Sequence, residues 1–187
     1  MRAIDWPEAL KIAAGKLSGD ASRIGAIAGD LCSVEEMKAA KDLFDALGVV
    51  SYDCRQDGSK LTAGNRQSYL FNTTIAGIED ADAILIIGAN PRTEATMINA
   101  RIRKTWLNND TQVGLIGAPV DLTYPYEHVG TSAKDLAGLK SKRNGFIKTL
   151  KDAKRPMIIL GSAALAGADG TQVLRAAGEL AAAVGAV

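Results

Sequence analysis

The sequence is poor in the residues that most often bind metals or form disulfides. Its 187 residues include two cysteines, Cys32 and Cys54, and a single histidine, His128. One histidine excludes a His-rich metal site, and two cysteines without a C-x-x-C spacing argue against an iron–sulfur or zinc centre within this chain. Two thiols also form no disulfide framework, which fits a reducing compartment.

Long apolar runs and an excess of one charge are also missing. No apolar stretch approaches the roughly 18 residues of a membrane span, and the N-terminus lacks the apolar core of a signal peptide. The 22 basic and 21 acidic residues give a net charge of +1. This balance gives no electrostatic case for nucleic acid or for an anionic membrane surface. We therefore expect no nucleic-acid partner and no direct membrane insertion, with the chain in the cytosol or facing it.

Motifs for phosphate binding and nucleophilic catalysis are absent as well. Neither G-x-x-x-x-G-K-[ST] nor G-x-G-x-x-G occurs in the sequence, so no nucleotide-binding fingerprint is present. A Ser-His-Asp triad would have to use His128, which follows Tyr126 and Glu127 in a segment with prolines. That setting is more typical of a structural histidine, and the residues alone give no catalytic constellation.

The clearest element that is present runs from residue 81 to residue 90, ADAILIIGAN. The continuous apolar run over residues 83–87 predicts a strand buried on both faces, as in parallel sheets. Pro91 favours an extended Asn90, and Asn90 or Thr93 is then placed to cap a helix. Gly88-Ala89-Asn90-Pro91 is either a ligand-binding turn at the carboxyl end of this strand or a plain tight turn.

Other short apolar runs repeat this pattern along the chain. Strands are predicted at residues 24–28, 49–52, 113–116 and 156–160. Helices are predicted between them, with caps at Asp5, Ser33 and Asn144 and an end at Gly48. The pattern predicts an α/β fold, a doubly wound, mostly parallel, Rossmann-like sheet of about five strands with helices on both faces.

The predicted organisation is a single domain over residues 1–187, with a leading helix in residues 1–20 and an α/β core in residues 21–187. The last helix ends in an apolar run, residues 180–184, with nothing after it to cover that face, so we interpret the chain as a fragment of a longer polypeptide. Two long irregular segments, residues 55–77 and 118–132, are typical of functional or mobile loops.

Four separated stretches of the chain carry a resemblance to known proteins. ADAILIIGANPRTEATMINARIRKTW, residues 81–106, closely resembles the molybdopterin oxidoreductase superfamily, whose pattern runs from an apolar strand through Gly-x-Asn-Pro to Asn-Ala-Arg-x-Arg-Lys. Residues 52–55, 113–124 and 156–165 narrow the likeness to the large iron–sulfur subunits of respiratory complex I. The resemblance covers nearly the whole chain, and its motifs occur in the same order.

The resemblance implies a piece of the C-terminal domain of that subunit. The iron–sulfur clusters of the family belong to an N-terminal region whose cysteine motifs are absent here, so no cofactor is expected in this fragment. Active superfamily members bind a molybdenum–pterin dinucleotide and place Asp-Pro-Arg-x-Thr after a strand, where this chain has Ala118-Pro119-Val120. This segment lacks the acidic and guanidinium groups, so polar groups of a buried cofactor would stay without a hydrogen-bond partner. Each such group would weaken binding by about 1–3 kcal/mol.

A second departure follows Cys54 and Arg55. Active relatives can carry a metal-binding Cys or selenocysteine a few residues further on, but the next residues, 56–59, are Gln-Asp-Gly-Ser and provide no thiolate. Cys54 itself is a weaker candidate ligand, because it comes at the end of a predicted strand, before the long loop.

We therefore expect a structural role within the peripheral arm of NADH:quinone oxidoreductase, with a vestigial molybdopterin-type cleft. No catalytic, cofactor-binding or metal-binding residue is assigned. The implied partners are other peripheral-arm subunits, and the implied location is the cytoplasmic side of the bacterial inner membrane or the mitochondrial matrix side, in a membrane-associated complex. The loops at 55–77 and 124–128 are the predicted interface or cleft-filling segments.

Two alternatives remain. The chain could be a fragment of an active molybdopterin-dinucleotide-dependent oxidoreductase that binds its cofactor at Gly88, Asn90 and Thr93. It could also be a nucleotide-binding domain of another oxidoreductase type, such as the central domain of thiamine diphosphate enzymes. Those share an apolar strand ending in glycine but lack the Asn-Ala-Arg-x-Arg-Lys helix.

Overall fold

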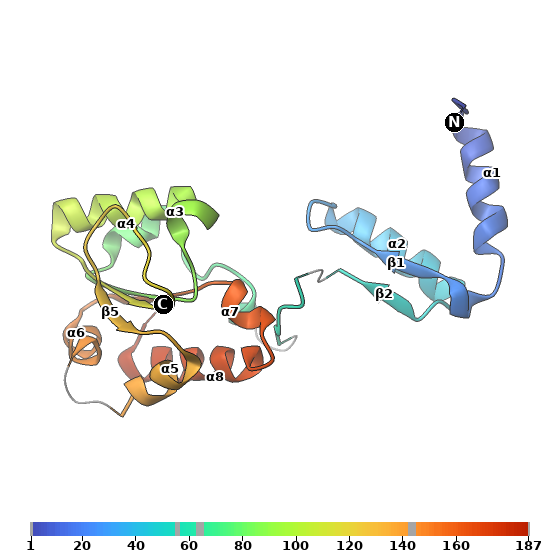
Figure 1. Cartoon of the computed structure of the whole chain (residues 1–187). Helices are drawn as coiled ribbons and strands as arrows, with labels where there is room; N and C mark the ends of the chain where they lie inside the picture. The colour runs from blue at the N-terminus through green and yellow to red at the C-terminus, as the bar shows by residue number, and fades with distance from the viewer. Residues whose placement is uncertain (1, 55–56, 63–65, 142–144, 187) are drawn as a thin grey trace. The chain divides into compact units, whose positions relative to one another are not determined.

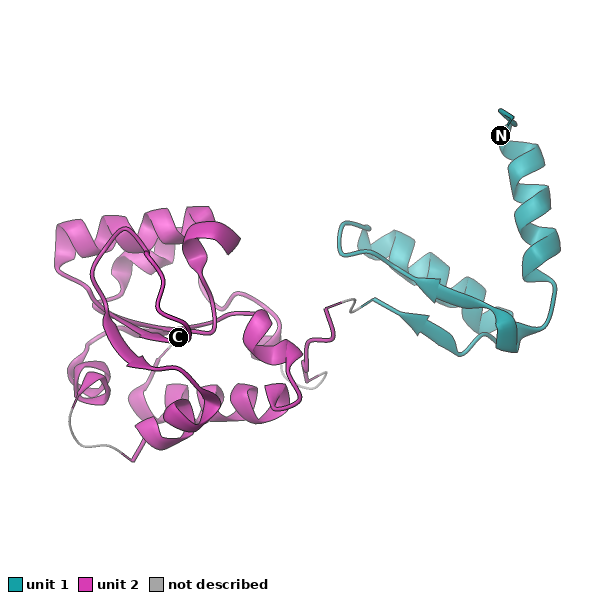
Figure 2. Cartoon of the chain, viewed as in Figure 1, with its two compact units in different colours: residues 1–56 teal, residues 57–187 magenta. Residues whose placement is uncertain are grey.

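The computed structural model describes residues 2–54, 57–62, 66–141 and 145–186. The chain divides into two compact units, Met1–Gln56 and Asp57–Val187 (Figure 2). The predicted fold class, α/β with parallel sheets, is confirmed. The strands differ from the prediction in their arrangement: they form a two-stranded sheet in the first unit and a four-stranded sheet in the second. The single domain over residues 1–187 stays a prediction.

The first unit is built from two helices and a pair of parallel strands. Its elements in chain order are α1 (Trp6–Leu17), η1 (Ala21–Arg23), β1 (Gly25–Ile27), α2 (Val34–Ala46) and β2 (Ser51–Asp53). The predicted caps are confirmed: Asp5 accepts a hydrogen bond from the Glu8 N–H, and Ser33 forms a capping box with Glu36. Among the described residues of this unit Val49 is the only buried apolar residue, so the unit has almost no core of its own.

The second unit holds the larger sheet. Its elements are η2 (Arg66–Ser68), η3 (Ala76–Asp80), β3 (Ala83–Ile87), α3 (Pro91–Glu94), α4 (Thr96–Asn109), β4 (Gln112–Ile116), β5 (Glu127–Gly130), α5 (Ala133–Leu139), α6 (Phe146–Asp152), β6 (Pro156–Leu160), α7 (Ala163–Ala166) and α8 (Gly170–Val184). The strand order is β5-β4-β3-β6 and every pairing is parallel. In Figure 1, α3 and α4 lie on one side of this sheet and α5, α6 and α8 on the other.

The two faces of the sheet explain why β3 is apolar throughout. Successive side chains of a strand point to opposite faces. Leu85 and Ile87 pack with residues of α5, α6 and α8, whereas Ile84 and Ile86 pack with η3, α4 and the segment around Leu122. All five residues of β3 are buried, so a polar residue at any of them would lack water on either side.

Two local predictions differ from the structure. The helix after β3 is broken at Ala95, whose non-helical backbone (φ −148°, ψ 66°) separates the four-residue α3 from α4. Neither Asn90 nor Thr93 therefore caps the long helix through its side chain. His128 and its neighbours, predicted as irregular, form strand β5. The predicted cap at Asn144 lies outside the described residues.

The last helix is covered, contrary to the sequence interpretation. Leu180 of α8 is 1% exposed and belongs to the core cluster that contains Leu85 of β3. The uncovered apolar face predicted for this helix is therefore wrong, because α5, α7 and β6 pack against it. Over the described ranges, no helix has the length and apolarity needed to cross a membrane.

Candidate functional site

The strand order places a topological switch point between β3 and β6. From β3 the chain continues outward to β4 and then β5, whereas β6 lies on the other side of β3. In open α/β sheets, ligands bind beyond the carboxyl ends of the strands at this kind of crossover. The turn at Gly88 follows β3 and the turn at Gly161 follows β6, so these two turns form the base of the candidate site.

The two turns are in direct contact. The Gly161 N–H donates to the Ile87 carbonyl at 2.9 Å. A Cβ added at Gly161 would lie 2.5 Å from the Gly88 carbonyl oxygen, and a Cβ added at Gly88 would lie 2.5 Å from the Ala164 Cβ. Gly88 also has a φ of +59°, which favours glycine. Both glycines are required because the turns pack against each other, and this packing fills the base of the switch point.

The turn after β3 uses most of its polar groups internally. The N–H groups of Thr93 and Glu94 both donate to the Asn90 carbonyl, at 3.0 and 2.9 Å, and Pro91 has no N–H to offer. The Asn90 N–H donates to the Glu94 carboxylate at 3.1 Å. Gly88, Asn90 and Thr93, the residues named in the alternative cofactor-binding interpretation, lie in this one turn, but most of the N–H groups that would receive a phosphate are already paired.

One polar atom at this turn is an exception. The side-chain oxygen Oδ1 of Asn90 is buried and has no hydrogen-bond partner among the described residues. This oxygen cannot bind an anion, because it is a hydrogen-bond acceptor and repels negative charge. Only hydrogen-bond donors bind an anion. It would accept one hydrogen bond from a water or another donor.

The segment after β4 is closed by its own aromatic side chains. The Tyr126 hydroxyl donates to the Val120 carbonyl at 2.8 Å and accepts from the Val120 N–H at 3.0 Å. His128 contacts the Gly117 carbonyl through Nε2 at 2.9 Å. These bonds pair the N–H and carbonyl of Val120 and the carbonyl of Gly117, on either side of Ala118 and Pro119.

An ion pair joins the turn after β3 to the segment after β4. Arg92 of α3 contacts the carboxylate of Asp121. The Thr123 N–H also donates to Asp121 at 2.9 Å. The hydrogen bond from Thr123 and, to a smaller extent, the contact with Arg92 hold the pKa of Asp121 below its ordinary value. Because both side chains are largely exposed, this pair orients the loop and contributes little to stability.

A buried hydrogen-bond chain fixes the same segment to α4. The Asn99 amide donates to the Leu122 carbonyl at 3.2 Å, and the Tyr124 hydroxyl donates to Asn99 Oδ1 at 2.9 Å. Tyr124 is 6% exposed, and burial raises the pKa of its hydroxyl. The segment is therefore part of the core on the α4 face. In the sequence, Asn99 stands out only as the first residue of the Asn-Ala-Arg-x-Arg-Lys motif, and its contact with Tyr124 depends on the fold.

The remaining sequence candidates belong to the first unit or fall outside the described residues. Cys32 and Cys54 are exposed free thiols in the first unit, and Arg55 lies outside the described residues. Among the residues that the structure describes, no group of three or more His, Cys, Asp or Glu side chains is arranged to hold a metal ion.

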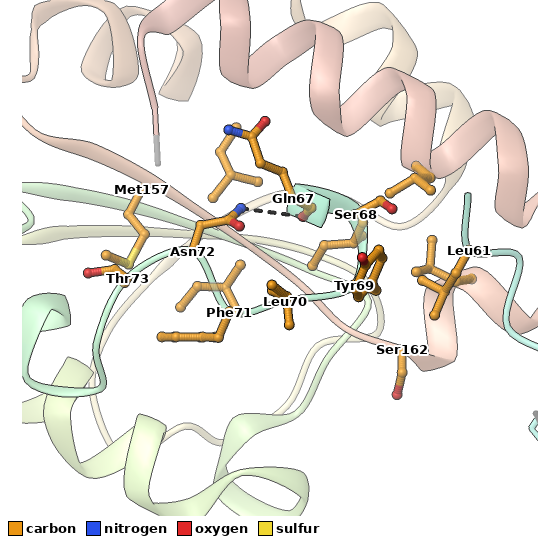
Figure 3. A pocket seen from close by; sticks show the side chains of 15 residues that line it. Leu61, Gln67, Ser68, Tyr69, Leu70, Phe71, Asn72, Thr73, Met157 and Ser162 are labelled. Atoms are coloured by element: carbon orange, nitrogen blue, oxygen red, sulfur yellow. Dashed lines mark hydrogen bonds between the residues drawn. The ribbon is translucent and has the colours of Figure 1, made fainter. Parts of the chain in front are cut away.

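A cavity of about 330 Å³ lies along β6 and extends to Leu160 and Ser162, on either side of Gly161. Strand β6 and residues 67–73 line it (Figure 3). Leu61, Leu165 and Leu174 also belong to the lining. Asn72 donates a hydrogen bond to the Gln67 carbonyl across this segment at 3.4 Å. Most of the lining side chains are apolar, and none of those that the structure describes is charged.

Comparison with known proteins gives a consistent set of relatives. The family model of molybdopterin oxidoreductase matches residues 2–187. The chain is 39% identical over 162 residues to the NADH dehydrogenase [ubiquinone] iron-sulfur protein 1, mitochondrial, of Solanum tuberosum, covering 86% of this chain and 22% of that protein. It is 44% identical over 151 residues to the NADH-ubiquinone oxidoreductase 78 kDa subunit, mitochondrial, of Neurospora crassa. That match covers 78% of this chain and 20% of the Neurospora crassa protein.

A bacterial relative shows the same likeness. The chain is 43% identical over 170 residues to the G subunit of the NADH-quinone oxidoreductase of Rickettsia conorii, covering 90% of this chain and 25% of that protein. The chain thus spans about a fifth to a quarter of the length of these relatives.

Proposed function

The chain belongs to the molybdopterin oxidoreductase family, and we propose that it is a structural part of the large iron–sulfur subunit of NADH:quinone oxidoreductase. Its similarity to three such subunits from a plant, a fungus and a bacterium supports this assignment. In this role the chain takes part in respiratory electron transport by packing and holding neighbouring parts, and it carries out no chemical step of its own.

The observation that carries the proposal is the contact between the turns at Gly88 and Gly161. A pterin dinucleotide would need room for a pyrophosphate at the switch point and many hydrogen-bonding groups around it. Here the Ala164 methyl group lies where a side chain at Gly88 would be, and the N–H groups of Thr93 and Glu94 are paired within the turn. The described residues of this edge therefore do not fit that cofactor, and we propose that the chain binds neither a cofactor nor a metal and has no catalytic residue.

The two irregular segments differ in how far their aromatic side chains are buried, which supports a different role for each: one fills space within the second unit and the other forms a protein interface. In residues 118–126, Tyr124 is buried and Tyr126 half-buried, so these aromatic side chains fill space beside α4. In the other segment, Tyr69, Leu70 and Phe71 are each about half exposed. Adjacent exposed apolar side chains are typical of protein contacts. We assign residues 66–77 to an interface with a neighbouring peripheral-arm subunit or with the rest of the same polypeptide.

The location follows from the assignment. As part of a membrane-associated complex, the chain would lie on the cytoplasmic side of a bacterial inner membrane or on the matrix side in mitochondria. The iron–sulfur clusters would belong to other parts of the full-length subunit, since the described residues provide no cluster of thiolates.

Analysis of the full-length protein, purified in its complex, tests the proposal. We expect iron and acid-labile sulfide in stoichiometric amounts, but neither molybdenum or tungsten by elemental analysis nor pterin fluorescence after oxidation. Stoichiometric molybdenum with pterin would establish the active molybdopterin enzyme instead. Copurification with the other subunits of an NADH:quinone oxidoreductase is the second expected result, and a protein that purifies alone would contradict the assignment.

A further inference from the structure

The basic residues of the chain are unevenly distributed. Residues 134–155 contain eight of the 22 Lys and Arg residues but only two of the 21 Asp and Glu residues. The rest of the chain then has 14 basic and 19 acidic residues, so the net charge of +1 conceals a positive segment on an otherwise acidic chain. A local excess of this size creates a positive potential that the overall charge does not reveal.

The structure places four lysines of this segment at exposed positions directly after α5, on α6 and in the turn that follows α6. We call them the basic face: Lys140, Lys148, Lys151 and Lys154. The opposite side of α6 is fixed, because Phe146, Ile147 and Leu150 are each at most 3% exposed in the core. The lysines of α6 are therefore held on a rigid helix rather than on a free loop.

Few acidic groups neutralise the basic face. Among the ion pairs of the described residues, Lys148, Lys151 and Lys154 take part in none, and Lys140 reaches Glu179 only at 3.7 Å. Glu179 is shared with Arg175, which contacts it at 2.9 Å. Asp152 is the one acidic residue of α6, and it makes no ion pair within the described ranges. The Asp82 carboxylate lies close enough to Lys154 for their charges to interact, so Lys148 and Lys151 carry the positive charge that is free to act on a partner.

The surroundings of the basic face identify the kind of partner. Helices that bind membrane surfaces combine basic residues with exposed apolar anchors, and proteins that bind single-stranded nucleic acids add aromatic stacking platforms. Within residues 131–186, apart from 142–144, no large hydrophobic side chain is exposed. A surface of lysines alone fits an acidic protein surface, where charge complementarity sets orientation and encounter rate.

We propose that the basic face docks against an acidic surface of a neighbouring protein subunit. The inference rests on the proposed function, because an assembly provides the neighbour, and it goes further by naming the surface and the charge of its partner. The half-exposed apolar segment around Phe71 would then be a separate contact, held by apolar burial rather than by charge.

Lysine footprinting of the full-length protein within its purified complex tests the docking. Acetylation of amines is measured by mass spectrometry in the intact complex and after the subunit has been separated. We expect Lys148 and Lys151 to be protected only in the complex, by a factor of about ten or more. A carbodiimide, which joins amines to carboxylates in contact, is expected to link them to Asp or Glu residues of another polypeptide.

Charge variants on the same helix provide the matched comparison. Lys148→Glu with Lys151→Glu is expected to lower the salt concentration at which the subunit leaves the complex, whereas Asp152→Lys is expected to raise it. All three positions are exposed, so the helical content and melting temperature of the variants should equal those of the parent protein. A change of the same sign in both variants would overturn the proposal.

The other outcomes separate this inference from the proposed function. Equal acetylation in the complex and in the free subunit would overturn the docking surface while leaving the assignment to the complex intact. Protection that appears only with anionic lipid, in nanodiscs with and without phosphatidylglycerol, would replace the protein partner by a membrane. A protein that does not copurify with any complex would remove the proposed function itself.

Discussion

At the scale of single residues, the switch point is determined by small side chains that permit close contact. Gly88, Gly161 and Ala164 bring the turn after β3 and the turn after β6 into direct contact. Gly88 has the positive φ that a tight turn needs, while Gly161 is constrained only by space. The same residue type thus serves two physical purposes, and a substitution at each position tests a different one.

Gly161→Ala is expected to lower the free energy of unfolding by about 1–3 kcal/mol, because its methyl group would lie 2.5 Å from the Gly88 carbonyl oxygen and 2.7 Å from the Ala89 Cβ. Urea denaturation measures the change. Gly178→Ala is the matched control: a Cβ at that position of α8 meets nothing within 4 Å, so a gain of roughly 0.5–1 kcal/mol is expected. An equal effect of the two substitutions would refute the close contact.

Tyr124→Phe is expected to lower the free energy of unfolding by about 1–3 kcal/mol, because the buried Asn99 Oδ1 would lose its hydrogen-bond donor. Tyr69→Phe, at a tyrosine that is 49% exposed, should change stability by less than about 0.5 kcal/mol. Both values come from chemical denaturation near neutral pH.

The pH dependence of the same variant provides an independent readout. Burial raises the pKa of Tyr124 above its ordinary value of 10.0. The unfolded chain therefore ionises first, and the stabilisation by the neutral hydroxyl is present below that value and lost as pH rises above it. The stability difference between the parent protein and Tyr124→Phe should shrink above about pH 10. A difference that stays constant would mean that Tyr124 ionises equally in both states.

At the scale of elements, β3 organises the second unit from both of its ends. Its carboxyl end forms the switch point, and at its amino end Asp82 fixes the neighbouring strand. The Asp82 carboxylate accepts hydrogen bonds from the backbone N–H groups of Lys154 and Arg155 at 2.8 and 2.9 Å. These two residues come directly before β6, which pairs with β3 in parallel register from Ala83 and Pro156 onward. One carboxylate thus sets where β6 begins.

Asp82→Asn is expected to lower stability by about 1 kcal/mol at pH 7, because an amide offers one acceptor oxygen where the carboxylate offers two. Burial raises the pKa of Asp82, but the hydrogen bonds from Arg155 and Lys154 outweigh it, so the pKa is lowered from 3.8. The carboxylate then stabilises the fold above that value, and this stabilisation is lost as pH falls through the lower folded-state pKa.

Denaturation curves at pH 7 and near pH 3 check this dependence. The difference between the parent protein and Asp82→Asn should be larger at pH 7 than at the acidic pH. Asp152→Asn serves as the control, since that exposed carboxylate makes no hydrogen bond or ion pair among the described residues and should have little effect at either pH. A stability difference between the parent protein and Asp82→Asn that grows as the pH falls would contradict the role of the ionised Asp82.

The elements also show which features a sequence can reveal. The sequence predicts strand β3 with its bounds at residues 83–87, because this apolar run is bounded by Asp82 and Gly88 and is too short for a helix. It does not predict strand β5, because Val129 is the only large apolar residue in Glu127–Gly130, and the pairing with β4 is interrupted by an irregular register. An edge strand with one neighbour carries too little apolar pattern to be recognised locally.

The candidate site is predictable only in part for a similar reason. Gly88 and Asn90 stand out in the sequence because a strand followed by glycine and proline marks a turn at the carboxyl edge. Gly161 and Ala164 cannot be connected to them from the sequence, since their contact depends on β6 lying beside β3. The break at Ala95 also escapes prediction: its backbone is set by the turn around Asn90 and no proline or glycine marks it.

At the scale of the whole molecule, the two units differ in how much core they contain. Apart from Val49, every buried apolar residue among the described residues lies in the second unit, on the two faces of its sheet. In the first unit, α1 and α2 contain no buried residue, and Trp6 is 79% exposed. Folding free energy comes largely from apolar burial, so the two units should not be equally stable on their own.

The last prediction concerns fragments 57–187 and 1–56. Fragment 57–187 keeps the β5-β4-β3-β6 sheet and both core clusters, so we expect a cooperative thermal transition followed by circular dichroism. Fragment 1–56 has a two-stranded sheet and almost no buried apolar surface, and two strands alone are marginal in water, so no cooperative transition is expected. Leu85→Ala in the larger fragment should lower the free energy of unfolding by about 2–5 kcal/mol. This loss would verify that the thermal transition of the fragment reports unfolding of the sheet core. Cooperative unfolding of 1–56 alone would show that the first unit has a core of its own.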